Sequence, residues 1–213
     1  MLAMPTHRDI PPVTVTSLLA TCDLLTAKGI PYKCEIQVGS SIVTFSRSKA
    51  AHSFLQSDYT HLFWVDSDIV WAADDFLKVL ALTTKLDVVG AAYPAKQDPT
   101  VFFINFDDPN FVFNEFGCFD LKGMGLGFTC VSRHIIEKLA AKAPLEKLPD
   151  TPEPIPSIFR IDCKDGNARG EDMAFFADIR DLGHQTFCCP TVRLGHVGSK
   201  IYAASLIEYL KEK

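Results

Sequence analysis

The sequence lacks the features that mark membrane, secreted and repeat proteins. Its 213 residues contain no apolar run near the ~20 residues that a membrane-spanning helix needs. The first eight residues lack the basic region followed by an apolar one that is typical of a secretory signal peptide. No segment of the chain repeats another. We therefore expect a cytoplasmic protein with no transmembrane segment.

Metal-binding cysteine pairs are also missing. The chain has seven cysteines but no Cys-x-x-Cys pair, which argues against a cysteine-based zinc site. Adjacent Cys188 and Cys189 would point to opposite faces of a strand, a poor arrangement for chelating one metal. The odd number of cysteines favours reduced core thiols in a cytosolic protein.

The chain has no excess of positive charge. Its formal net charge is −5, which argues against a protein that clamps a nucleic-acid backbone over its whole surface. An acidic balance suits a protein that recruits divalent cations. The composition, 47% hydrophobic and 22% charged, is that of an ordinary globular protein. A chain of this length buries about 70% of its unfolded surface, so it needs no disulfide or zinc to fold.

The first half of the chain alternates helical and extended patterns. Helical spacing of apolar residues covers 13–28, 46–55 and 74–83. Strand patterns cover 32–38, 62–65 and 86–93. Gly29 and Pro31 end the first helix. Strands that alternate with helices predict βαβ units and a mostly parallel sheet.

The second half has a different texture. Residues 101–119 carry seven of the sixteen phenylalanines around a turn signal at 107–110, which predicts antiparallel hairpin strands that pack a core or offer a stacking surface. The proline-rich segment 144–169 is interpreted as a lid or acceptor-facing loop rather than a plain linker. Helices are expected at 133–142, 171–182 and 203–213, with a strand at 186–189 and a returning segment at 192–196.

An apolar strand ends in two carboxylates at Asp66-Ser67-Asp68. Because positions i and i+2 of an extended chain point to the same side, Asp66 and Asp68 project together from the carboxyl end of this strand. Open α/β sheets bind ligands at that end. Two carboxylates ~5.5 Å apart repel by roughly 3 kcal/mol at an effective dielectric constant of ~20, and a divalent cation would turn that cost into binding. The alternative is a solvated turn.

Four features follow one another along the chain. They are Asp66-Ser67-Asp68, the glycine-rich segment Gly123–Gly127, Gly170-Glu171-Asp172 at the start of a helix, and His196 between Gly195 and Gly198. This order resembles that of the GT-A glycosyltransferases, most closely the small bacterial and phage members related to family two. The resemblance runs from Pro5-Thr6 to about Tyr202, and it implies a GT-A fold.

The resemblance also implies an α/β domain over residues 1–213, with a mostly parallel sheet flanked by helices and an antiparallel hairpin region. Residues 1–95 would form the nucleotide-binding half and 96–202 the acceptor and catalytic half. Residues 203–213 would form a C-terminal helix.

A metal ion belongs to this resemblance. Asp68 would bind Mn²⁺ or Mg²⁺ directly, Asp66 would hold the ribose or a metal-bound water, and His196 would supply an imidazole. Oxygen ligands with one imidazole suit Mn²⁺ at least as well as Mg²⁺. The metal would bridge the two phosphates of the donor and neutralise the leaving nucleoside diphosphate.

Further donor contacts follow from the same resemblance. Pro5 and Thr6 would face the nucleotide base, with Ser67 inside the Asp-x-Asp motif. Arg47 would contact the nucleotide or pyrophosphate, although Ser46-Arg47-Ser48 departs from the Arg-Asn common in relatives. Gly125 would let the backbone approach the sugar. Lys200 would touch the diphosphate.

The acceptor side is assigned to Glu171 and Asp172. Asp172 is the candidate general base, which makes inversion at the anomeric carbon the expected outcome. Glu171 would contact the acceptor or orient the lid. Both acids could instead only cap a helix.

The donor and acceptor are only partly defined by the resemblance. The donor is expected to be a nucleoside-diphosphate sugar, most commonly of UDP, and the acceptor can be a polysaccharide, a lipid-linked sugar, a protein or modified phage DNA. Two other functions compete: a haloacid-dehalogenase-type phosphatase with Asp66 as nucleophile, and a non-catalytic nucleotide-sugar-binding module.

Overall fold

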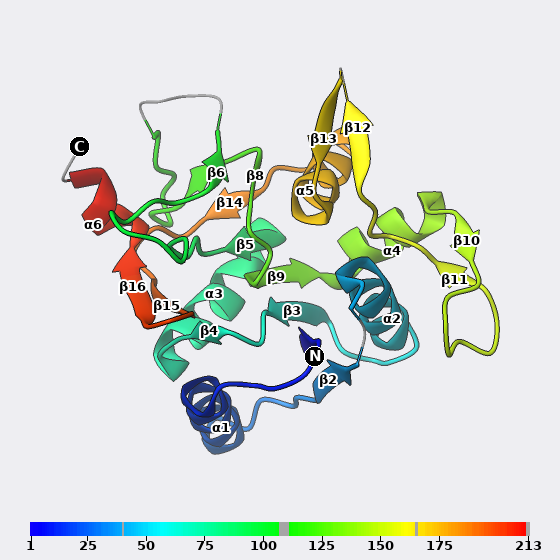
Figure 1. Ribbon diagram of the computed structural model, residues 1–213, viewed down its shortest axis with the longest axis horizontal. Coiled ribbons are helices and arrows are strands. Elements are labelled where there is room, and N and C mark those ends of the chain that lie inside the picture. The colour runs from blue at the N-terminus through cyan, green and yellow to red at the C-terminus, as the bar shows by residue number, and fades with distance from the viewer. Residues whose placement is uncertain (40, 107–110, 165, 212–213) are drawn as a thin grey trace.

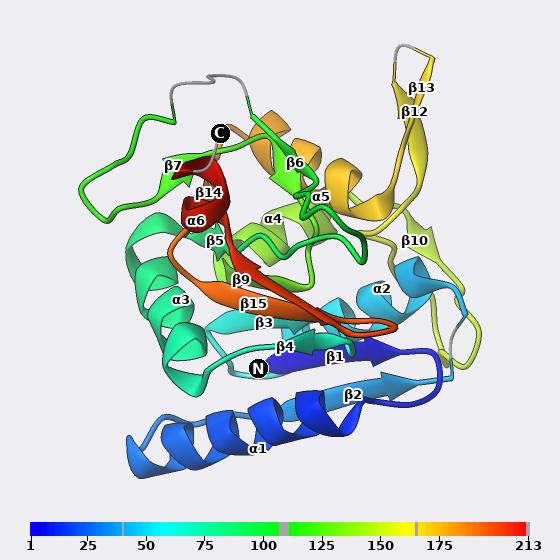
Figure 2. The same ribbon diagram turned by 60° about the vertical axis from the view of Figure 1, so that its left-hand side comes forward.

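A seven-stranded sheet forms the centre of the protein. The computed structural model describes residues 1–39, 41–106, 111–164 and 166–211. The strand order is β2–β1–β3–β9–β5–β14–β7 (Figures 1 and 2). In that order the strands are Cys34–Val38, Leu2–Thr6, His61–Val65, Phe128–Ser132, Val88–Gly90, Phe187–Cys188 and Phe119–Asp120. Five of these strands run in one direction, and β9 and β7 run against them. The expected mostly parallel α/β sheet is confirmed.

Helices cover both faces of this sheet. The longer helices are α1 (Pro12–Ala27), α2 (Val43–Leu55), α3 (Ala73–Leu86), α4 (Arg133–Lys142) and α5 (Glu171–Asp181). Helices α1 and α3 pack on one face, and α2, α4 and α5 cover the other (Figures 1 and 2). Strand β3 shows why two cores form: Leu62 and Trp64 point into one core, and Phe63 and Val65 into the other.

A second sheet positions the end of the chain near the first. Its strands are β16 (Ile201–Ser205), β15 (Arg193–Val197) and β4 (Ile69–Val70), in that order. Strand β4 follows directly after the Asp-x-Asp segment, and its Ile69 pairs with His196 of β15. The main-chain N–H of Val197 also donates to the carbonyl of Asp68 at 2.8 Å. This pairing brings His196 to the carboxyl end of β3.

Two predicted boundaries are wrong for identifiable reasons. The strand expected at 86–93 is shorter in the structure, where only β5 forms. Its start is later than predicted because Leu86 still belongs to α3 and Asp87 ends that helix with φ +61°. The helix expected at 203–213 begins only at Leu206, as α6 (Leu206–Lys211), because residues 203–205 pair with β15. Residues 212–213 lie outside the described part. Cross-strand pairing overrides the helical spacing of these residues.

The phenylalanine-rich region forms two antiparallel strands, β6 and β7, which pair with other strands and not with one another. Strand β6 (Ile104–Asn105) pairs with β8 (Gly123–Met124), and β7 pairs with β14 at the edge of the main sheet. Only an isolated bridge joins Phe113 to Phe119. The turn expected at 107–110 lies outside the described residues.

The segment 144–169, expected to be a loop, contains two short hairpins. Strand β10 (Leu145–Glu146) pairs with β11 (Ile155–Pro156), and β12 (Asp162–Lys164) pairs with β13 (Asn167–Arg169). The β12–β13 hairpin projects from the body of the protein in both views (Figures 1 and 2). Within the four described ranges, no helix is both long and apolar enough to cross a bilayer.

Arg133 fastens the end of α2 to the start of α4. Its guanidinium donates to the carbonyls of Phe54, Ser57 and Tyr59 at 3.0, 2.6 and 2.7 Å. It also lies 4.4 Å from the centre of the Phe54 ring. One planar guanidinium therefore donates to three carbonyls at the end of α2 and in the turn that follows it.

We predict that Arg133→Met lowers the free energy of unfolding by about 2–4 kcal/mol, because carbonyls in this turn lose their donor. Urea denaturation followed by circular dichroism measures the loss. Arg193→Met is the matched control: its ion pair with Glu208 is exposed on both sides, so the expected loss is below about 1 kcal/mol. Equal losses in both variants would contradict this role of Arg133.

Candidate functional site

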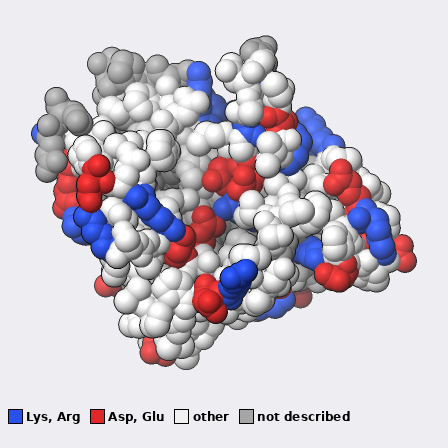
Figure 3. All heavy atoms as spheres, in the orientation of Figure 1, with Lys and Arg blue, Asp and Glu red and all other residues white. Residues whose placement is uncertain are grey.

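A cleft of about 360 Å³ opens at the carboxyl ends of β1 and β3. Figure 3 shows Asp and Glu atoms gathered around a hollow in the middle of one face. The cleft is lined by Pro5, Thr6, His7, Ser41, Val43, Ser46, Arg47, Asp66, Ser67, Asp68, Tyr93, Glu171, Asp172 and His196. Of the eleven residues that the sequence places in the site, nine are in this lining, and Gly125 and Lys200 are not.

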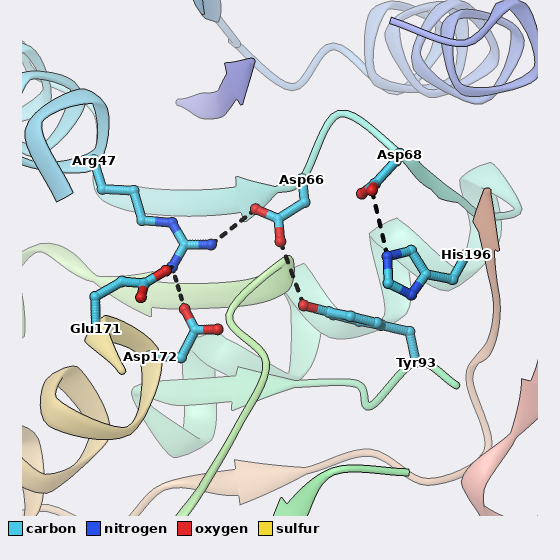
Figure 4. A network of polar contacts seen from close by, with 7 residues as sticks. All are labelled: Arg47, Asp66, Asp68, Tyr93, Glu171, Asp172 and His196. Carbon is cyan, nitrogen blue, oxygen red and sulfur yellow. Dashed lines mark hydrogen bonds and ion pairs between the residues drawn. The ribbon is translucent and has the colours of Figure 1, made fainter. Parts of the chain in front are cut away.

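Arg47 is the hub of the cleft. Its side chain is only 3% exposed on α2, and it reaches carboxylates on two other elements. Nη2 donates to Oδ1 of Asp66 at 2.9 Å, and Nη1 donates to Oε1 of Glu171 at 3.2 Å and to Oδ1 of Asp172 (Figure 4). Asp66 directly follows β3, and the two acids start α5. The guanidinium therefore joins the Asp-x-Asp segment to the helix that carries the candidate base.

The charges around Arg47 do not balance. Three carboxylates surround one guanidinium, which leaves a formal surplus of two negative charges. Burial lowers the pKa of Arg47, but Asp66, Asp172 and Glu171 outweigh it and raise that pKa, so Arg47 stays charged. Burial, with Asp66 and Glu171, raises the pKa of Asp172 despite the opposing effect of Arg47. A surplus of negative charge in a partly buried cleft favours a bound cation.

Asp68 faces a histidine and a lysine. Nε2 of His196 lies 3.4 Å from Oδ2 of Asp68, and Nζ of Lys96 donates to the same oxygen at 2.5 Å. Burial alone would raise the pKa of Asp68, but hydrogen bonds from His196 and Lys96 lower it to about 2. This carboxylate is therefore ionised at any physiological pH.

The ring of His196 is oriented like that of a metal ligand. Nδ1 lies 3.0 Å from the carbonyl oxygen of Pro94, which can only accept, so Nδ1 carries a proton. The other ring nitrogen, Nε2, then faces the carboxylate of Asp68, and either a proton or a metal ion can lie between them. Metal-bound histidines commonly donate their second N–H to a backbone carbonyl in this way. Asp68 and His196 fit Mn²⁺ or Mg²⁺.

Asp66 contacts other residues than Asp68 does. One of its oxygens binds Arg47, and Oδ2 accepts from the hydroxyl of Tyr93 at 3.3 Å (Figure 4). A Cβ on Gly127 would lie 2.4 Å from this Oδ2, so the position of Asp66 requires a glycine there. A Cβ on Gly125 would lie 2.3 Å from the Tyr93 hydroxyl. The glycine-rich segment thus makes room for Asp66 and Tyr93, and a sugar contact by Gly125 stays a prediction.

The remaining predicted residues vary in their placement. Pro5 and Thr6 end β1 at the rim of the cleft, as expected. Nζ of Lys200 donates to Asp98 at 2.5 Å and lies outside the lining, so its contact with a diphosphate also stays a prediction.

Sequence interpretation missed Tyr93 and Lys96. Tyr93 had a signal, because it ends the predicted strand 86–93, as Asp66 ends another. Lys96 lies in an irregular segment, where local sequence carries no sign of its contact with Asp68.

Comparison with known proteins supports a fold assignment. No family model matches the chain, and no curated protein sequence matches it. Among solved structures, A197 from STIV has a TM-score of 0.62 and 23% identity, over 97% of this chain and 89% of A197. GalNAc-T7, crystallised with UDP, GalNAc and Mn²⁺, has a TM-score of 0.58 and 11% identity, over 92% of this chain and 43% of that one. The chain has a GT-A-like α/β fold, as the resemblance in sequence predicted.

We predict that Arg47→Met lowers the free energy of unfolding by roughly 3–5 kcal/mol at pH 7, because three carboxylates lose their shared cation. Burial already raises the pKa of Asp172 in the folded state, and removal of Arg47 removes the cation that opposes this rise. Such a group contributes stability below the unfolded pKa, and that contribution is lost as the pH rises through the folded pKa. The difference in the free energy of unfolding between the wild type and Arg47→Met should therefore shrink as the pH falls from 7 towards 4.

Thermal denaturation of both proteins across this pH range measures the change. Arg160→Met is the control, since the Arg160 side chain is 44% exposed whereas that of Arg47 is 3% exposed. A deficit in Arg47→Met that is independent of pH would contradict the electrostatic role of Arg47.

Proposed function

We propose that the protein is a metal-dependent glycosyltransferase that moves a sugar from a nucleoside-diphosphate donor to an acceptor hydroxyl. One observation carries this proposal: the carboxyl ends of β1 and β3 gather Asp66, Asp68, His196, Glu171 and Asp172 around a single cleft. The GT-A-like fold supports it, as does the presence of UDP, GalNAc and Mn²⁺ in the structure of GalNAc-T7. UDP-sugars are the donors to test first.

Residues 1–95 would bind the donor. Pro5 and Thr6 at the end of β1 face the base, and Ser67 lies between the two motif carboxylates at the rim. Asp68 and His196 would hold Mn²⁺ or Mg²⁺, and Asp66 would hold the ribose or a metal-bound water. When bound, the metal neutralises the diphosphate and so favours its departure. A doubly negative diphosphate would otherwise meet a cleft that already has surplus negative charge.

Lys96 has a place in this proposal. Its ammonium lies on the Asp68 oxygen that a metal would use, and its side chain is 39% exposed. A flexible lysine can leave this oxygen when a divalent ion arrives, and it can then pair with a phosphate of the donor. Lys96 thus satisfies Asp68 before the metal binds and contributes positive charge afterwards.

Residues 96–202 would bind the acceptor and carry the base. Arg47 holds Oδ1 of Asp172, and among described residues no contact is found for its other oxygen. That oxygen takes the proton of the acceptor hydroxyl while the acceptor oxygen attacks the anomeric carbon. The bond from that carbon to the phosphate oxygen breaks on the opposite side, and the nucleoside diphosphate leaves. A single displacement of this kind inverts the anomeric centre.

The raised pKa of Asp172 suits this role, because a more basic carboxylate accepts a proton more readily. Glu171, held by the same guanidinium, would contact the acceptor or orient the lid. The acceptor itself remains one of four classes: a polysaccharide, a lipid-linked sugar, a protein or modified phage DNA.

We predict that Asp68→Asn weakens Mn²⁺-dependent donor binding at least about tenfold, since it removes a charged ligand. Release of nucleoside diphosphate from UDP-, GDP- and dTDP-sugars, with and without Mn²⁺, is the measurement. Asp74→Asn, an exposed acid at the start of α3, is the matched control and should release diphosphate like the wild type.

Two results would overturn the proposal. Tight binding of a nucleotide sugar with no turnover on any acceptor class would indicate a binding module. Cleavage of p-nitrophenyl phosphate that Asp66→Asn abolishes would indicate the phosphatase. Both oxygens of Asp66 already have partners, which disfavours a nucleophilic role.

We predict that Asp172→Asn leaves donor binding within about twofold of the wild type but slows transfer by ~10²–10⁴-fold. Calorimetry with the nucleoside diphosphate and Mn²⁺ reports binding, and product formation reports transfer. Glu171→Gln, which alters the neighbouring acid on the same guanidinium, is the control and should reduce transfer less. Full transfer by Asp172→Asn would exclude Asp172 as the base.

A further inference from the structure

A second group of metal-ligating side chains lies outside the cleft. Asp87, which joins α3 to β5, meets His134 of α4 and His184, which follows α5. One ligand atom from each lies within 4.8 Å of the others. In the described part of the chain, this is the only such group of three, and none of its members lines the cleft.

The distances suit a small transition-metal ion. Nε2 of His134 lies 3.4 Å from Oδ2 of Asp87, and the two imidazole rings lie 5.7 Å apart between centres. Ligands on a tetrahedral zinc ion, with bonds of ~2.1 Å, lie about 3.4 Å from one another. Small side-chain rotations would therefore bring all three donors onto one ion. Two imidazoles with one carboxylate form a common three-ligand zinc set, which leaves a fourth position for water.

The main chain holds Asp87 in place. Its N–H donates to the carbonyl of Thr83 at 3.1 Å, and its own carbonyl accepts from the N–H of Ser132 at 2.8 Å. His134 lies two residues further along from Ser132, at the start of α4. The positions of Asp87 and His134 are thus coupled through the backbone. An ion there would link α3, α4 and the end of α5, which are distant in sequence.

Lys138 opposes the binding of a metal ion by these three residues. Its Nζ lies 2.8 Å from Nε2 of His184, one turn along α4 from His134. This lysine is exposed, so it can move to solvent when a cation binds. Burial, Lys138 and His134 lower the pKa of His184 against the opposing effect of Asp87.

We propose that Asp87, His134 and His184 form a surface site for a divalent ion of the zinc type, separate from the cleft. Such an ion stabilises the fold where α3, α4 and the end of α5 meet. Imidazole-rich sites prefer Zn²⁺ over Mg²⁺ and Ca²⁺, whereas Asp68 in the cleft suits harder ions. The proposal does not depend on the proposed transfer of sugar.

The test is calorimetric titration of the full-length, tag-free protein with Zn²⁺ at pH 7.5. We expect one Zn²⁺ to bind, and His134→Ala or His184→Ala to weaken this binding at least about tenfold. Lys138→Gln should tighten it on the order of fivefold, because a competing charge is removed. His52→Ala is the matched histidine control, and Cys163→Ser removes the exposed thiol. Neither should alter the affinity.

Stability gives a second readout. Zn²⁺ should raise the urea midpoint of the wild type and of Asp68→Asn, but not that of His184→Ala, because an ion that binds only the folded state stabilises it. No binding up to millimolar Zn²⁺ would overturn the site. So would binding that Asp68→Asn or Cys163→Ser abolishes while His134→Ala and His184→Ala retain it.

Discussion

The arrangement of the cleft depends on one buried guanidinium. Arg47 is nearly inaccessible to solvent, and a buried charge is tolerable only when partners surround it. Its partners are Asp66, directly after β3, and two acids in the first turn of α5, more than a hundred residues further along the chain. Because a planar fork requires its acceptors in fixed directions, Arg47 sets the position of Asp66 relative to Glu171 and Asp172. The donor-facing and acceptor-facing acids of the proposed reaction are therefore held by the same side chain.

This arrangement leaves more negative than positive charge in the cleft. The uneven distribution of that charge accounts for the pKa values of Asp68 and Asp172. Arg47 neutralises one of three carboxylates, and Lys96 and His196 converge on the fourth, Asp68. The low pKa of Asp68 and the raised pKa of Asp172 follow from the same distribution: cations gather at one carboxylate and burial dominates at the other. One acid is thereby suited to hold a metal and the other to accept a proton.

The parts that could be predicted from sequence are those with a local signal. An apolar run that ends in Asp66-Ser67-Asp68 predicts both β3 and a site at its end, and Glu171-Asp172 marks the start of α5. Strand β9 was not predicted although Phe128–Ser132 is apolar and β-branched, because the glycines that precede it are typical of a loop. The contacts of Lys96, and the strand at 203–205, depend on chain segments far away in sequence. Local patterns carry no information about such partners.

The glycine-rich segment shows how the antiparallel strand serves the site. The carbonyl of Gly127, just before β9, accepts from the N–H of Asp66 at 2.9 Å, so the backbone there runs directly against the motif. Gly127 leaves the space that the Asp66 carboxylate fills, and Gly125 leaves the space for the Tyr93 hydroxyl that binds the same carboxylate. A side chain at Gly127 would push Asp66 away from Arg47 and so disturb the acids on α5. The reversed strand at the centre of the sheet therefore supports the network that Arg47 organises.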